Sequence, residues 1–262
     1  MDRARQLGAL RQALASLDPS VAAGRHGVFS LGAGPVDAAL GGGLARGAMH
    51  EIFPVHAADI AAAAGFAVGL ALRAAPRAPV FWIRHRRSGA ETGALHAHGL
   101  AEMGLAADRL VAVHVDGIAD GLRAGLEAMR CPGLGAVIFE SWGTSKHLDL
   151  TASRRFSLAA EGSGVTGFFL RAMTGPEPSA AATRWQVEAA SSSDPLGLVG
   201  RAALSARLLR RRSGPSDGRW TLEWNHETLG FALPPALSGA VSAPHYDRPA
   251  AASGDPGWAR AG

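Results

Sequence analysis

Short apolar runs alternate with helical patterns along most of the chain, and this alternation constrains the fold more than any other feature. The runs have the length and the Val, Ile and Phe content of buried strands, whereas the segments between them have the apolar spacing of helices. Strands interleaved with helices predict parallel βαβ units with right-handed crossovers. We therefore expect an α/β fold with a mostly parallel central sheet flanked by helices. The expected strands are 48–53, 80–83, 110–115, 135–139 and 165–170, and the expected helices are 57–72, 95–103, 117–130 and 150–161.

The length and the C-terminal composition predict one core with appendages. A chain of 262 residues is too short for two full domains of ordinary size. Three later segments, 183–189, 204–211 and 220–224, have strand composition and are joined by turns, which predicts antiparallel edge strands. The last residues are mainly Pro, Ala, Gly and Ser and have little to bury. We expect an N-terminal helix and linker over 1–27, a core over 28–235 and a disordered tail over 236–262.

Leucines near the N-terminus recur at spacings of three, four and three residues. This spacing places them on one face of an amphipathic helix, which Asp18-Pro19 would end. The stripe needs an apolar partner, and both the chain's own core and another protein suit it. The candidate partner-binding residues are Leu7, Leu10, Leu14 and Leu17.

Charge and composition favour a cytoplasmic protein with an acidic partner. The chain lacks an uncharged apolar run of about 18 residues and does not begin like a signal peptide, so we expect neither a membrane span nor export. A net charge of +4 and a pI of about 10.4 favour a polyanion or an acidic protein surface. The single cysteine, Cys131, cannot form an internal disulfide, and we expect it to be a small buried residue.

The first junction between a strand and a helix, at 53–62, lacks the residues that bind nucleotide phosphates. A phosphate loop needs glycines for close backbone approach, a lysine for the phosphate charge, and a Ser or Thr hydroxyl for Mg²⁺. Residues 53–62 contain no Gly, Lys, Ser or Thr. Pro54 removes one N–H donor and Asp59 adds negative charge, and both changes oppose the binding of a triphosphate. We therefore expect no nucleotide cofactor.

Glu140 follows the apolar run 135–139, where a nucleotide hydrolase would carry its metal-binding carboxylate. A carboxylate in this position can also be a hydrogen-bonding residue, and the missing phosphate loop favours that alternative. The segment 143–146, which holds the single lysine, has no P-loop arrangement, and His96 with His98 lacks a third metal ligand. We expect a surface loop at 143–146, a turn at 162–164, and neither a catalytic set nor a metal site.

Arginines gather in three places. Arg84, Arg86 and Arg87 follow a predicted strand at the sheet edge where α/β proteins bind ligands, which makes them a candidate basic patch for phosphate or an acidic partner. A solvated face explains them equally well. Arg154 and Arg155 are expected on the solvent face of a helix, and 210–212 is expected to protect an edge strand.

Several motifs resemble one RecA-like family. The glycine turn at 41–47 and the order of the following elements are similar to the entry of the RecA core. Within that superfamily the chain resembles ImuA, the RecA-like accessory protein of bacterial inducible mutagenesis, over about residues 28–230 and at the N-terminal helix. The motifs are Leu-Gly-Ala-Gly at 31–34, Arg-Cys-Pro-Gly-Leu-Gly-Ala-Val at 130–137, Asp-Leu-Thr-Ala-Ser-Arg-Arg at 149–155, and Ser-Ala-Ala-Ala-Thr-Arg-Trp at 179–185.

This resemblance implies a non-enzymatic adaptor in SOS-induced, error-prone translesion DNA synthesis. Its implied partners are an ImuB-type Y-family-like polymerase, the error-prone DNA polymerase III alpha subunit and RecA, in the cytoplasm and at the nucleoid when in complex. Arg86 falls near the place of the RecA catalytic glutamate, and 175–182, in the place of a DNA-binding loop, has no basic residue. DNA contact is therefore expected to be indirect. The alternatives are a RecA-like ATPase with a divergent site and a SulA-like inhibitor of cell division.

Overall fold

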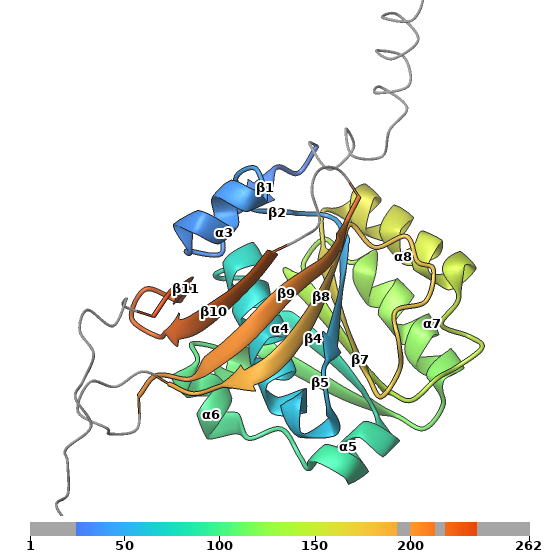
Figure 1. Ribbon diagram of the computed structural model, residues 1–262. Coiled ribbons are helices and arrows are strands. Elements are labelled where there is room, and N and C mark those ends of the chain that lie inside the picture. The colour runs from blue at the N-terminus through green and yellow to red at the C-terminus, as the bar shows by residue number, and fades with distance from the viewer. Residues whose placement is uncertain (1–24, 193–199, 213–217, 235–262) are drawn as a thin grey trace, which may run out of the picture.

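The computed structural model describes residues 25–192, 200–212 and 218–234, and a single large sheet organises them (Figure 1). The spatial order of the sheet is β11-β10-β9-β8-β3-β7-β6-β4-β5. A two-stranded ribbon of β1 (Val28–Phe29) and β2 (Leu44–Ala45) precedes it. The strands of the sheet are β3 Met49–Pro54, β4 Val80–His85, β5 Leu110–Val115, β6 Ala136–Trp142, β7 Thr166–Ala172, β8 Thr183–Ala190, β9 Ala203–Arg211, β10 Gly218–Asn225 and β11 Gly230–Ala232.

Neighbouring strands from β8 to β5 run parallel, whereas β9, β10 and β11 add antiparallel pairs at one edge. This arrangement confirms the expected α/β class, with a mostly parallel sheet followed by antiparallel strands. The segment 183–189, expected as an antiparallel edge strand, is instead β8, which lies inside the sheet and pairs parallel with β3. Strands β4, β6 and β7 contain nearly continuous apolar runs, which is typical of parallel strands covered by helices on both faces. β5 also has an apolar sequence, but it forms an edge of the sheet and its Val111 is 45% exposed.

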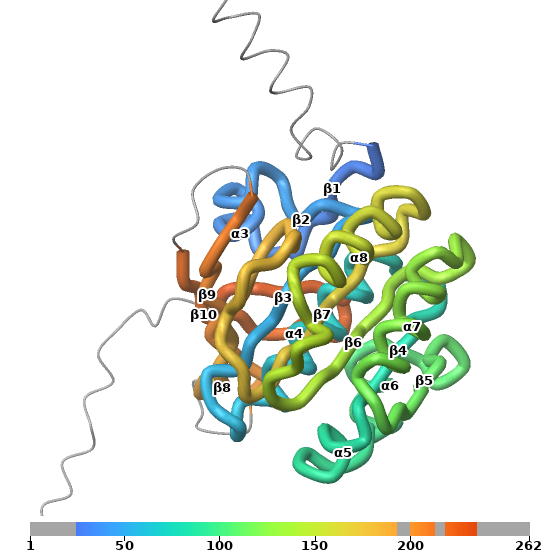
Figure 2. Tube along the Cα trace, turned by 90° about the vertical axis from the view of Figure 1, so that its right-hand side faces the viewer, coloured from blue at the N-terminus to red at the C-terminus, as the bar shows by residue number. Residues whose placement is uncertain are grey.

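Helices cover the two faces of the sheet, as Figures 1 and 2 show together. One face packs against α4 (Ile60–Ala74), around Phe66, Trp82 and Trp185. The other face packs against α7 (Ile118–Met129) and α8 (Leu150–Ser163), around Phe139, Phe156 and Phe169. The two hydrophobic clusters hold the sheet between helical layers. The remaining described helices are α3 Gly34–Ala39, α5 Arg86–Thr92, α6 Ala97–Glu102 and the short 3-10 helices η1 Ala57–Asp59 and η2 Ala107–Arg109.

The segment 57–74 is long and apolar enough to cross a membrane by length and composition alone. In the fold it is η1 followed by α4, and nine residues of α4 are buried. Phe66 and Leu70 lie in the larger hydrophobic cluster. Packing against the sheet therefore accounts for the apolar character of this helix.

Several local predictions are corrected by the structure. The helix expected at 95–103 is only α6, because His96 is its N-cap and accepts a hydrogen bond from the Gly99 N–H. The turn expected at 162–164 is the end of α8, which continues to Ser163 and stops at Gly164 with φ +82°. Cys131 is exposed rather than buried. The expected N-terminal helix and the expected tail lie outside the described residues.

Candidate functional site

Asp59 closes the junction where a phosphate loop would lie. It stands at the end of η1, between β3 and α4, and only 8% of its surface is exposed. Its Oδ2 accepts a hydrogen bond from the backbone N–H of His56 at 2.9 Å, and its Oδ1 accepts one from the backbone N–H of Ala189 at 2.9 Å. The Asp59 carboxylate therefore caps the start of η1 through the His56 N–H and ties it to β8 through the Ala189 N–H, at the end of the helix where a phosphate would otherwise bind.

A phosphate group would meet this carboxylate at close range. Two negative charges a few ångströms apart repel each other, and burial strengthens the repulsion. The first turns of the helix offer no lysine and no hydroxyl, since residues 57–64 are Ala, Asp and Ile. The junction can stabilise the helix start and join it to β8, but it has none of the chemistry that binds a triphosphate.

Glu140 on β6 is a buried hydrogen-bonding residue. Its two carboxylate oxygens accept hydrogen bonds from Nε and Nη2 of Arg84 on β4, at 2.8 and 3.0 Å. The indole Nε1 of Trp82 donates to Oε2 at 3.1 Å. The exposed fractions of the Glu140 and Arg84 side chains are 2% and 4%. The carboxylate is thus neutralised within the sheet, which agrees with the hydrogen-bonding alternative for Glu140.

Arg84 also ties β4 to the end of α5. Its Nη1 donates to the Gly93 carbonyl at 2.9 Å and its Nη2 to Thr92 Oγ1 at 2.9 Å. Each of its three guanidinium nitrogens therefore has a partner within the chain. Both the guanidinium of Arg84 and the carboxylate of Glu140 therefore have hydrogen-bond partners, which a buried ion pair requires for stability.

The candidate basic patch does not form as one exposed surface. Arg84 is buried, because its side chain points into the sheet layer toward Glu140. Arg86 and Arg87 lie on α5 and are exposed, and each lies near an acidic side chain: Arg86 pairs with Asp116, and Arg87 lies 3.9 Å from Glu91. Of the candidate patch, only Arg86 and Arg87 are therefore exposed, and Arg84 belongs to the core of the sheet.

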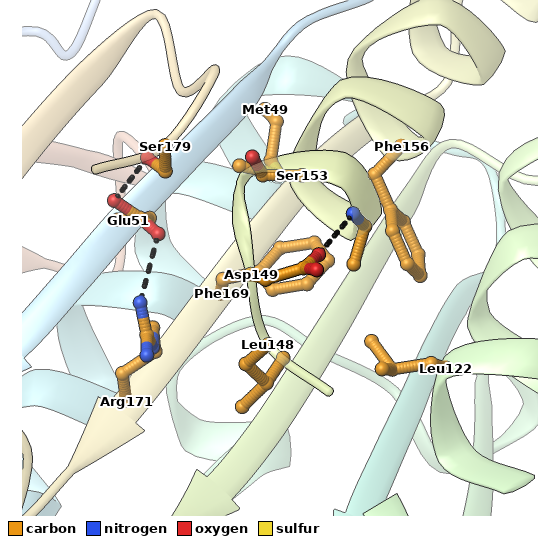
Figure 3. A pocket seen from close by; sticks show the side chains of 11 residues that line it. Met49, Glu51, Leu122, Leu148, Asp149, Ser153, Phe156, Phe169, Arg171 and Ser179 are labelled. Atoms are coloured by element: carbon orange, nitrogen blue, oxygen red, sulfur yellow. Dashed lines mark hydrogen bonds and ion pairs between the residues drawn. The ribbon is translucent and has the colours of Figure 1, made fainter. Parts of the chain in front are cut away.

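A second buried network lies on the opposite face of the sheet (Figure 3). Glu51 on β3 accepts hydrogen bonds from Ser179 Oγ at 2.7 Å and from Arg184 Nε at 2.7 Å. Nη1 of Arg171, on β7, approaches the other Glu51 oxygen at 3.4 Å, and its Nη2 binds Glu177 at 2.9 Å. The network fixes the loop between β7 and β8 to three strands.

The small pocket beside this network has the size of one water molecule. Its volume is about 10 Å³, and α8 and the apolar side chains of Met49, Phe156 and Phe169 surround it. Arg171 lines it, and its Nε is buried without a hydrogen-bond partner. A cavity of this size holds at most a single water, so the site suits a structural role.

The other predicted residues lie as follows. Arg154 and Arg155 are exposed on α8, as expected, and His98 is exposed on α6. The arginines at 210–212 do not protect an edge strand, because β9 has neighbours on both sides and their guanidinium groups donate to carbonyls of Ser179, Leu40 and Ala180.

Within the described residues, no group of three His, Cys, Asp or Glu side chains could hold a metal ion. The stripe of Leu7, Leu10, Leu14 and Leu17 lies outside those residues.

A comparison with solved structures decides the type of fold. A structure described as the crystal structure of the RadB recombinase superposes with a TM-score of 0.52, at 14% identity, over 78% of this chain and 99% of that chain. The fold is RecA-like. At this identity the likeness shows the fold alone. No protein-family model matches the sequence, and no curated protein matches it either.

In a RecA-like fold, two positions matter for nucleotide binding: the junction between β3 and α4 and the carboxylate on β6. We call them the two closed positions, because side chains of this chain occupy both. The resemblance to RecA places the phosphate loop at the junction after β3 and the metal-binding carboxylate at Glu140 on β6. In this chain Asp59 binds the backbone of the first position, and Arg84 neutralises the second. Sequence reasoning identified Glu140, but it missed both the Arg84 partner and the Glu51 network, whose members lie up to 133 residues apart.

Proposed function

We propose that this protein is a non-catalytic RecA-like adaptor in SOS-induced, error-prone translesion DNA synthesis. The observation that carries the non-catalytic part is the pair of closed positions. Asp59 accepts hydrogen bonds from the His56 N–H at the helix start and from the Ala189 N–H of β8, and Glu140 is bound by Arg84 rather than free for a metal ion. A fold that keeps its layers without these functional groups suits binding better than phosphoryl transfer.

The role in mutagenesis is supported by the resemblance to ImuA. The proposed partners are an ImuB-type polymerase, the error-prone DNA polymerase III alpha subunit and RecA. The leucine spacing at 7–17 predicts an apolar stripe, which is the proposed docking face. The loop between β7 and β8 carries no basic residue, and its Glu177 is paired with Arg171, so direct DNA binding through this loop is not part of the proposal.

An exposed apolar strand edge also suits a binding protein. β5 forms one edge of the nine-stranded sheet, and its sequence is Leu-Val-Ala-Val-His-Val. Edge strands that avoid association usually carry charges or proline, and β5 carries neither apart from the ionisable His114. Among the described residues β5 has a neighbouring strand on one side only, so its other side offers a place where another chain can add a strand.

Partner capture tests the adaptor role. The purified full chain is immobilised and titrated with the ImuB-type polymerase. We expect Leu10→Asp with Leu14→Asp to weaken capture by more than about tenfold, because two buried charges at an apolar interface cost more than 1.4 kcal/mol. Leu158→Asp is the matched control, since Leu158 is 68% exposed on α8. Unchanged capture by the double variant would refute docking through the stripe.

The two alternatives give different results. Saturable, Mg²⁺-dependent ATP turnover that Glu140→Gln abolishes would support a RecA-like ATPase with a divergent site. Direct binding to the cell-division GTPase would support the SulA-like inhibitor. The closed phosphate position argues against the first, and no described feature favours the second.

A further inference from the structure

A cavity of about 340 Å³ opens between α4 and α6, at the carboxyl ends of β4 and β6. This is the edge at which parallel α/β sheets bind ligands. Its walls are mainly apolar and include Ala64 and Val68 of α4, Leu100 and Met103 around α6, and Trp82 beneath them. The volume lies within the range of small-molecule sites, which is about 300–1,000 Å³.

The floor of the cavity is polar but already paired. Arg84 and Glu140 line it, and they form the buried ion pair described above. Two further polar residues line the cavity: Thr92 accepts from Arg84 and donates to the Ser88 carbonyl at 2.8 Å, and Nδ1 of His96 accepts from the Gly99 N–H at 3.1 Å. A charged ligand would therefore lose its hydration without gaining a free counter-charge from these groups. The chemistry selects an uncharged ligand.

Gly65 keeps this space open. A glycine inside a helix costs about 0.5–1 kcal/mol relative to alanine, so its presence calls for a packing reason. Gly69, one turn later, has such a reason, because a Cβ there would lie 2.5 Å from Cζ of Phe231. At Gly65, which lines the cavity, the nearest atom to an added Cβ would be Cε of Met103 at 3.8 Å, an ordinary contact. The packing of the described chain does not require glycine here.

We propose that this cavity is a binding site for an uncharged, mainly apolar small molecule. The ligand lies against α4 at Gly65, between Val68 and Met103, with Trp82 and the Arg84–Glu140 pair at its inner end. This site adds to the proposed adaptor function and does not depend on it. It needs neither the phosphate junction at Asp59 nor the leucine stripe.

Fluorescence titration with N-phenyl-1-naphthylamine, an uncharged dye that brightens in apolar surroundings, tests the site on the full chain. We expect saturable binding to one site. Gly65→Leu places a side chain in the cavity and should weaken binding at least about tenfold. Gly162→Leu is the control, because Gly162 is an exposed glycine of α8 with no atom within 4 Å of an added Cβ. Ala61→Phe, at an exposed lining position, is a second variant that does not enter the core and should also weaken binding.

Two results would overturn the site. One is the absence of saturable dye binding to the wild-type chain, and the other is equal affinity of the wild type and both cavity variants. Thermal melts of each variant confirm that it is folded. We expect Gly65→Leu to melt no lower than the wild type, because it gains helix propensity and fills empty volume.

The charge of the ligand is tested with a matched dye. The compound 8-anilinonaphthalene-1-sulfonate differs from the first dye by a sulfonate group. We expect it to bind at least about tenfold more weakly, because the sulfonate loses hydration on burial and the guanidinium of Arg84 is already paired with Glu140. Equal or tighter binding of the sulfonate, sensitive to Gly65→Leu, would contradict an uncharged ligand.

Discussion

His50 is a buried histidine that the fold keeps neutral. It lies on β3 with 0% of its surface exposed, and its ring nitrogens lie 2.8 Å from Thr183 Oγ1 and 2.9 Å from the Ala45 carbonyl. Burial lowers the pKa of His50 from 6.5 to about 4; the charge of Arg212 acts in the same direction and the bond to Ala45 opposes it. The proton is therefore bound more tightly in the unfolded chain.

This difference predicts how stability depends on pH. Between pH 6.5 and about 4 the unfolded state binds the extra proton, so the free energy of unfolding falls as pH falls through this window, by up to about 3 kcal/mol. Urea melts of the wild type and His50→Gln check this, because glutamine does not titrate and should flatten the slope. His98→Gln removes an exposed histidine and is the control. Identical slopes for wild type and His50→Gln would show that His50 does not titrate as described.

The Arg84–Glu140 pair makes a second residue-scale prediction. Glu140→Ala leaves a buried guanidinium without its counter-charge and removes the acceptor of Trp82, so the free energy of unfolding should fall by about 3–5 kcal/mol. Replacing both partners, Arg84→Met with Glu140→Met, should cost less than the single change. Chemical denaturation of the wild type, the single variant and the double variant measures these free energies. Arg130→Ala breaks an exposed pair with Glu127 and should cost less than about 1 kcal/mol. A Glu140→Ala cost as small as that would contradict a buried pair.

At the scale of elements, β4, β5, β6 and β7 were predictable because each contains an apolar run between turns. The missed elements lack that signal. α5 reads Arg-Arg-Ser-Gly-Ala-Glu-Thr and has no apolar periodicity, and Arg84 fastens its end through Thr92 and Gly93. β11 has three residues and depends on pairing with β10. Tertiary contacts, not local sequence, create both elements.

The candidate site was predictable only in part, for a similar reason. Glu140 and Asp59 could be found because each stands at a fixed place relative to a strand or helix. Their partners could not, since Arg84 lies 56 residues from Glu140 and Ala189 lies 130 residues from Asp59. β5 shows the same limit, because its apolar sequence reads as a buried strand although the sheet order makes it an edge. Pairing across a sheet is a property of the topology.

At the scale of the whole molecule, the RecA-like layers are complete while the two nucleotide positions are closed by the chain's own side chains. Asp59 joins the helix start to β8, and Glu140 joins β6 to β4. Both groups contribute to holding the sheet and its helices together. We propose that this fold serves binding and not nucleotide turnover.

Calorimetric titration of the purified full chain with ATP and Mg²⁺ tests that claim most directly, with single-stranded DNA as a companion titration. We expect no saturable heat with ATP, because the Asp59 carboxylate would repel a triphosphate and the junction has no lysine to bind it. Saturable binding in the micromolar range, about −8 kcal/mol, would contradict it and would place a nucleotide site elsewhere on the fold.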